Sequence, residues 1–289
     1  MVYILAIASA ISFSLAAIFQ KRQVRGISTD ANLKVTLLWQ LIKNPYWILG
    51  VLFDIFAFVG QFLALKDGSI LVVSPILAFG LSITIFADAL FERKRPSWSM
   101  VGLTLVAGLL LAVFLSTTTT NASKFVPNFT LGVVISLVVT VIFVTARFAP
   151  FRHAKWWIDF ILPIFTGVTH GIAIFVTKAT ASLVTTSGFG ALFTHWPGYV
   201  LILIGAIDLI MTQSVLQLVE LSGVLPVVNL LEPTVAMALG VFFLKDHIHS
   251  SIGTFTVALL LVALGGVTFA ISVLSSRLVT EGDDSSDRH

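Results

Sequence analysis

Nine runs of about twenty apolar residues make up most of the chain, and each is long enough to cross the hydrocarbon core of a bilayer as a helix. Hydrophobic residues make up 57% of the sequence and charged residues 11%, whereas a soluble domain has about 25% charged residues. We therefore expect an all-α integral membrane protein. The predicted spans are 2–20, 46–65, 69–91, 97–116, 128–146, 158–178, 198–219, 223–244 and 251–274.

The basic residues between these runs predict how the chain is oriented, because cytoplasmic loops carry an excess of Lys and Arg. With the N-terminus outside, 13 of the 17 Lys and Arg residues fall on the cytoplasmic side. This split favours nine spans across the cell (plasma or inner) membrane, with a cytoplasmic C-terminus. Residues 31–43 are predicted as an amphipathic interfacial helix, and 180–195 as a re-entrant or interfacial connection.

The two halves of the chain resemble each other at an offset near 154, which places Asp54 on Asp208 and Val72-Val73 close to Val227-Val228. We predict two four-helix repeats joined by a linking helix. The odd number of intervening spans inverts the second copy, which is a frequent design in transporters. The predicted units are 1–116 (first repeat), 117–155 (linking span 5 with its loops), 156–274 (second, inverted repeat) and 275–289 (polar cytoplasmic tail).

A carboxylate and a proline, Glu232-Pro233, lie near the middle of the eighth run. A charge at that depth costs about 2.5–3.5 kcal/mol on insertion scales, and a proline removes a backbone hydrogen bond from the helix. A span tolerates both mainly where it lines a polar cavity. This segment therefore indicates that a solute or ion moves through the membrane.

The motif Leu231-Glu232-Pro233 with Gly240, and Val72-Val73-Ser74-Pro75 in the front half, resemble the repeated signature of EamA-like proteins of the drug/metabolite transporter (DMT) superfamily. Nine spans with an external N-terminus resemble the NIPA-like magnesium-transporter branch of that superfamily. The resemblance covers roughly residues 2–274, and it implies a gradient-driven membrane transporter. Lys245-Asp246 departs from the Gly-Glu usual at the end of that helix, so a gate role is not carried over to Asp246.

Asp54 and Asp208 are the first candidate binding residues, since each lies near the centre of its span. They could bind a cation, relay protons or meet a cationic substrate; the alternatives are a structural pair bonded to neighbouring helices or a carboxyl kept neutral by burial. Gln61 lies seven residues beyond Asp54 on the same helix face, and Thr212 lies one turn beyond Asp208, so both could line the same cavity.

Three further ionisable residues complete the candidate set. Glu232 is interpreted either as a coupling or binding group or as a packing partner beside the proline, and Asn229 shares its face. His170 has an ordinary pKa of about 6.5, which suits proton transfer, although a structural donor is the simpler interpretation. Lys178, near the end of its span, is expected to reach the interface by snorkelling; the alternative is an anion-binding group in the cavity.

The main functional hypothesis is a transporter that moves a small metabolite or other small solute by alternating access. A NIPA-like Mg²⁺ transporter, a flippase for a lipid-linked group and a non-transporting scaffold stay open as alternatives. No motif for an ATP site, a zinc site or a catalytic triad is present, so we expect no enzyme activity, no catalytic residue, no metal site and no cofactor. The expected partners are the solute or ion and the lipid bilayer, with a homodimer left open and nucleic acid excluded.

Overall fold

The computed structural model describes residues 1–24, 35–91, 98–120, 128–150, 152–218, 221–244 and 248–250, with short pieces between 256 and 270. This part of the chain is almost wholly helical. Its elements, in chain order, are α1 (Val2–Val24), α2 (Val35–Leu41), α3 (Pro45–Asp67), α4 (Ile70–Phe91), α5 (Trp98–Thr117), β1 (Thr118–Thr120), α6 (Phe129–Phe148), η2 (Trp157–Ile161), α7 (Leu162–Ser187), η3 (Phe189–Phe193), α8 (Trp196–Leu218), α9 (Leu221–Leu239), η4 (Gly240–Leu244) and β2 (Ile248–Ser250).

Five of the described helices are long and apolar enough to cross a membrane: α1, α3, α6, η2 with α7, and α8. Their outward faces carry large apolar side chains, such as Phe56 (68% exposed), Leu137 (61%) and Ile202 (75%). A hydrocarbon solvent suits such a surface, since every backbone polar group inside a helix is already bonded. The structure therefore confirms the prediction of a helical membrane protein.

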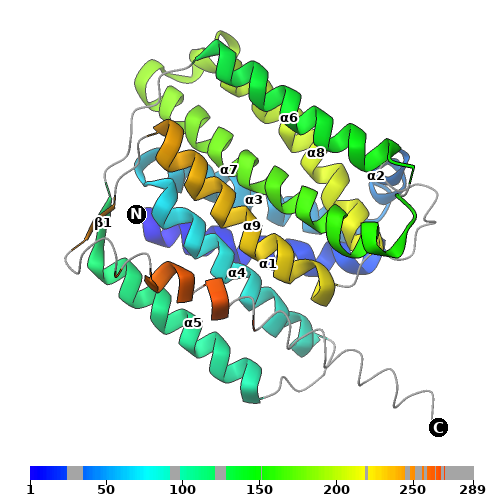
Figure 1. The fold of residues 1–289 in the computed structure, drawn as a ribbon, viewed down its shortest axis with the longest axis horizontal. Coiled ribbons are helices and arrows are strands. Elements are labelled where there is room, and N and C mark those ends of the chain that lie inside the picture. Colours follow the sequence, from blue (N-terminus) through cyan, green and yellow to red (C-terminus); the bar gives the residue numbers. More distant parts are fainter. Residues whose placement is uncertain are drawn as a thin grey trace.

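The long helices lie roughly side by side along one direction (Figure 1). α1 packs against α3 and α4, while α7 packs against α8 and α9. Contacts between the front and back halves are made by α4 with α9, α3 with α7, and α1 with α8. α7 contacts α3, α4, α6, α8 and α9, and so has a central place in the helix packing.

Polar residues at helix starts define where several helices begin. The side chain of Asn44 accepts hydrogen bonds from the backbone N–H groups of Tyr46 and Trp47, with Pro45 at the first helical position of α3. Ser69 Oγ accepts from Leu71 N at the start of α4. Such caps satisfy N–H groups that have no partner in the first turn.

The predicted spans agree with helix positions through the first five runs, and α2 lies within the predicted interfacial segment. The connection predicted at 180–195 is shorter than expected, because α7 extends through 180–187 and only 188–195, with η3, joins it to α8. Threonine hydroxyls in this stretch bond to carbonyls four residues back, as Thr180 and Thr185 do, so the polar side chains need no water. Gly188, with a φ of 76°, then ends the helix. Most of the predicted span 251–274 and the tail 275–289 lie outside the described residues.

Small residues set the close approach of α7 and α9. A Cβ added to Gly171 would lie 2.6 Å from Cβ of Val235 and 2.7 Å from the carbonyl oxygen of Glu232. At Gly167 an added Cβ would lie 2.9 Å from Cβ of Leu231. Close backbone contact of this kind is typical of packed membrane helices. These glycines therefore bring the backbone of α9 against the face of α7 that carries His170.

We expect Gly171→Ala to lower the free energy of unfolding by about 1–3 kcal/mol, because the added methyl group forces α7 and α9 apart. Gly205→Ala in α8 is the matched control, since no atom lies within 4 Å of its added Cβ. This control should be neutral or stabilising by up to about 1 kcal/mol, since alanine favours helix. Thermal unfolding of the purified protein in detergent measures both, and equal melting temperatures would contradict the prediction.

Candidate functional site

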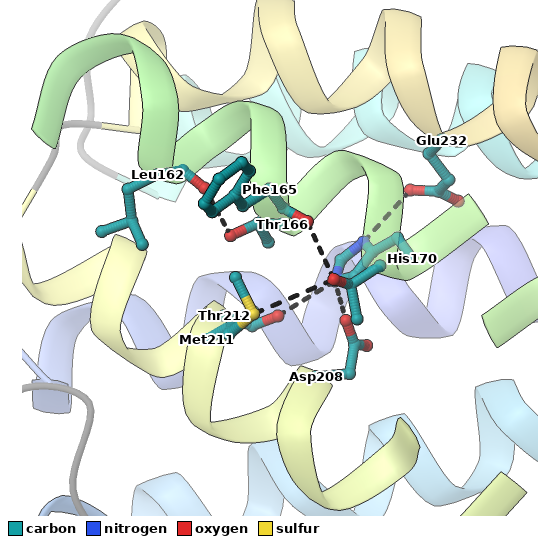
Figure 2. Close-up of polar contacts among 9 residues, drawn as sticks. Leu162, Phe165, Thr166, His170, Asp208, Met211, Thr212 and Glu232 are labelled. Carbon is teal, nitrogen blue, oxygen red and sulfur yellow. Dashed lines mark hydrogen bonds and ion pairs between the residues drawn. The ribbon is translucent and has the colours of Figure 1, made fainter. Parts of the chain in front are cut away.

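The imidazole of His170 lies between side chains of α8 and α9 (Figure 2). Its Nδ1 is 3.3 Å from Glu232 Oε2. Its Nε2 is 2.9 Å from Thr212 Oγ1 and 3.2 Å from Asp208 Oδ1. We call His170, Asp208, Thr212 and Glu232 the His170 cluster. Its three ionisable residues each lie near the middle of a helix, so the cluster is remote from the helix ends.

The local structure of α7 and α8 fixes where the ring lies. In α7, Thr166 and Thr169 donate to the carbonyls of Leu162 and Phe165, and Thr169 also contacts the sulfur of Met211 on α8. These hydroxyls are therefore satisfied within the helices and do not compete for the carboxylates. Asp208 and Thr212 are four residues apart and share one face of α8, so both reach the same ring nitrogen.

The cluster is accessible although it lies between helices. The side chains of His170 and Asp208 are each 24% exposed, and that of Glu232 is 14% exposed. Asp208 Oδ1 itself is buried and makes no hydrogen bond among the described residues, because the hydrogen bond of His170 Nε2 is made with Thr212. A buried carboxylate oxygen without a donor is costly, so this atom is an acceptor available to a ligand.

Asp54 of α3 belongs to the same electrostatic environment, since its charge interacts with those of Asp208 and His170. Its own hydrogen bond comes from another direction: Gln20 Nε2 of α1 donates to Asp54 Oδ2. The chain continues from Gln213 Nε2 of α8 to Gln20 Oε1, and from Trp47 Nε1 of α3 to Gln213 Oε1 at 3.1 Å. We call Trp47, Gln213, Gln20 and Asp54 the amide chain. It joins α1, α3 and α8 beside the His170 cluster.

Sequence patterns did not identify Gln20, Gln213 or Trp47 as site residues. All three are buried, and a buried amide in an apolar helix needs partners for both its N–H₂ and its carbonyl group. That requirement is the signal that could have identified the two glutamines. Gln213 follows Thr212 directly, so it faces a different side of α8 and points to Gln20 and Trp47.

Lys178 lies apart from the cluster, and the expectation that it snorkels to the interface was wrong. Its side chain is fully buried, and Nζ donates to the carbonyl oxygens of Leu65 and Gly68, at 2.7 Å each. The last carbonyls of a helix have no partner four residues on, and they lie at the negative end of the helix dipole. Lys178 therefore holds the end of α3 against α7.

Two further predicted site residues are Gln61 and Asn229. Gln61 is buried in α3, two turns beyond Asp54. Among the described residues, no hydrogen bond links its side chain to His170, Asp208 or Glu232. The backbone of Asn229 belongs to α9, and its side chain lies outside the described part of the structure. Among the described residues, no group of three or more His, Asp or Glu side chains is arranged to hold a metal ion.

A separate groove of about 650 Å³ lies between α6 and the start of α8. Its walls are mostly apolar, with Phe129, Leu137 and Trp196 among the lining residues. Neither the His170 cluster nor the amide chain contributes to it. The groove is therefore separate from the polar site.

The chain is similar to an uncharacterized protein of Corynebacterium glutamicum, with 26% identity over 249 residues, or 83% of each chain. No family model matches the sequence, and no solved structure matches it. The similarity extends over most of both chains. The relative has no described activity, so the similarity does not point to a function.

Proposed function

We propose that this protein is a membrane transporter that moves a small solute by alternating access and is driven by a gradient. The observation that carries the proposal is the meeting of His170, Asp208 and Glu232 near the middle of three apolar helices. Ionisable side chains inside membrane spans are costly and mark ion or substrate pathways. Their partial exposure supports access for a solute, whereas a purely structural cluster would be closed.

The proposed architecture is nine spans in two inverted four-helix repeats, as in EamA-like members of the DMT superfamily. Three features support it. The packing of α1 on α3 and α4 resembles that of α7 on α8 and α9. The counterparts α4 and α9 each contain an internal proline, Pro75 and Pro233. The carboxylates of α3 and α8, Asp54 and Asp208, come from corresponding helices and interact. A site between two inverted repeats is the usual place for transported substrates.

We place the protein in the plasma or inner membrane of the cell. In the proposed orientation the N-terminus is outside and the C-terminus is in the cytoplasm. The antiparallel pairing of β1 with β2 supports the scheme, because it aligns Thr118 with Ser250. The end of α5 and the end of η4 are therefore on one side of the helices, and nine spans place both outside.

The alternatives have less support from the described residues. Mg²⁺ keeps several waters and needs only one or two carboxylates from the protein, and no observation on the described residues favours it over an organic solute. A flippase would open its polar site towards lipid, whereas the apolar groove and the His170 cluster are separate.

Reconstituted proteoliposomes test the proposal with a mixture of candidate solutes. Vesicles are exposed to a small-metabolite extract under a proton or sodium gradient, and internal solutes are identified by mass spectrometry. We expect gradient-dependent uptake of a small set of solutes by the wild-type protein. Asp208→Asn and Asp54→Asn should each reduce that uptake at least about tenfold, the equivalent of about 1.4 kcal/mol.

Asp67→Asn is the matched control, because Asp67 is an exposed carboxylate at the end of the same helix as Asp54. We expect this variant to keep wild-type uptake. Uptake that needs no gradient, or that survives in Asp208→Asn and Asp54→Asn, would contradict the proposal.

A further inference from the structure

The charges of the site limit which solutes it can hold. The carboxyl groups of Asp208 and Glu232 lie 3.2 and 3.3 Å from the two nitrogens of one imidazole. The two ring nitrogens of His170 offer at most two N–H donors to the acceptor oxygens of these carboxyl groups. The ammonium group of Lys178 donates to the carbonyls of Leu65 and Gly68 at the end of α3. An anionic solute would add acceptors without donors, whereas a cation with N–H donors would pair with these carboxyl oxygens.

The geometry further indicates the kind of cation. The ring nitrogens of His170 lie 3.2 Å from Asp208 Oδ1 and 3.3 Å from Glu232 Oε2. A metal ion needs oxygen ligands at about 2.0–2.6 Å in a fixed arrangement, and the carboxylates of the described residues are not set for that. Planar N–H groups at hydrogen-bond distance match guanidinium best.

We infer that the solute is a small monovalent organic cation with N–H donors, of the guanidinium or ammonium type, which binds Asp208 and Glu232 in place of the ring of His170. The inference rests on the proposed transport function and names its substrate class. Asp208 Oδ1, buried and without a hydrogen bond among the described residues, is the acceptor that such a solute satisfies. His170 then acts as a built-in competitor, since its ring occupies the position between the carboxylates when the site is empty.

Two probes of the same shape test the charge requirement in the wild-type protein. Methylguanidinium and methylurea are similar in size and donor geometry, and only the first is charged. We expect methylguanidinium to stabilise the detergent-purified protein against thermal unfolding, with an apparent affinity at least about tenfold above that of methylurea. Equal effects of the two probes, or no effect of either, would overturn the inference.

Variants test the placement. Asp208→Asn should weaken methylguanidinium binding at least about tenfold, while Asp67→Asn should not change it. His170→Gln should strengthen methylguanidinium binding, because it removes the competing ring. If His170 instead donated to an anionic solute, the same substitution would weaken the binding of that solute. Weaker binding in a folded His170→Gln variant would therefore overturn the competition between ring and solute. The probe comparison needs no variant, so it decides the matter where a variant does not fold.

Failure of this inference and failure of the transport proposal give different results. Gradient-driven uptake of neutral or anionic solutes that is lost in Asp208→Asn would overturn the cation and keep the transporter. Binding of methylguanidinium without uptake of any solute would keep the cation site and overturn transport.

Discussion

His170→Leu is expected to lower the free energy of unfolding by about 3–5 kcal/mol, because it leaves two carboxylates without their positive partner. The ring nitrogens of His170 are 3.2 Å from Asp208 and 3.3 Å from Glu232. The 24% exposure of His170 and Asp208 allows some solvent screening, which places the expected value at the lower end of that range. Chemical denaturation of the purified protein in mixed micelles measures the loss.

Two controls separate the charge effect from a general effect of losing a histidine. His153→Leu changes an exposed histidine in the connection between α6 and α7, and should shift stability by no more than about 0.5 kcal/mol. The triple variant His170→Leu, Asp208→Asn, Glu232→Gln removes the uncompensated charge together with the ring. It should recover most of the stability, and a triple variant as unstable as His170→Leu would show that packing, not charge, explains the loss.

The membrane class and the central residues of the site could be predicted from the sequence, because a charge inside an apolar run is conspicuous wherever it occurs. Asp54, His170, Asp208 and Glu232 were each singled out for that reason. Their grouping could not be predicted in the same way. Which helix faces turn towards each other depends on close contacts such as that of Gly171 with the backbone of α9, and helical periodicity does not reveal the rotation of one helix relative to another.

Predictions that depended on helix ends failed for a physical reason. Lys178 was expected to reach the interface because the apolar run was taken to stop at that residue. α7 instead continues to Ser187, so Lys178 is interior and its ammonium group must find acceptors within the protein. Gln20 and Gln213 were missed because one amide in an apolar run does not identify its partner. Only the packing of α1, α3 and α8 shows that each amide completes the bonding of the other.

Lys178→Met is expected to lower the free energy of unfolding by about 2–5 kcal/mol, since the carbonyls of Leu65 and Gly68 each lose a charged donor while they stay buried. Methionine fills most of the volume of the lysine stem, so a cavity does not explain the loss. Lys155→Met, at an exposed position before α7, is the matched control and should shift stability by no more than about 0.5 kcal/mol.

The position of the contact adds a local effect to the global one. Lys178 holds the turn between α3 and α4, where the N–H groups of Val72 and Val73 bond to the carbonyl of Ser69. Without the ammonium group, this turn should open more often, and the amides of Val72 and Val73 should exchange hydrogen faster than amides of α8, which Lys178 does not hold. A uniform increase in exchange along the chain would instead mean that Lys178 contributes only to overall stability. Because the turn joins two helices of the front half while Lys178 belongs to the back half, faster exchange confined to it would identify this single ammonium group as a link between the halves.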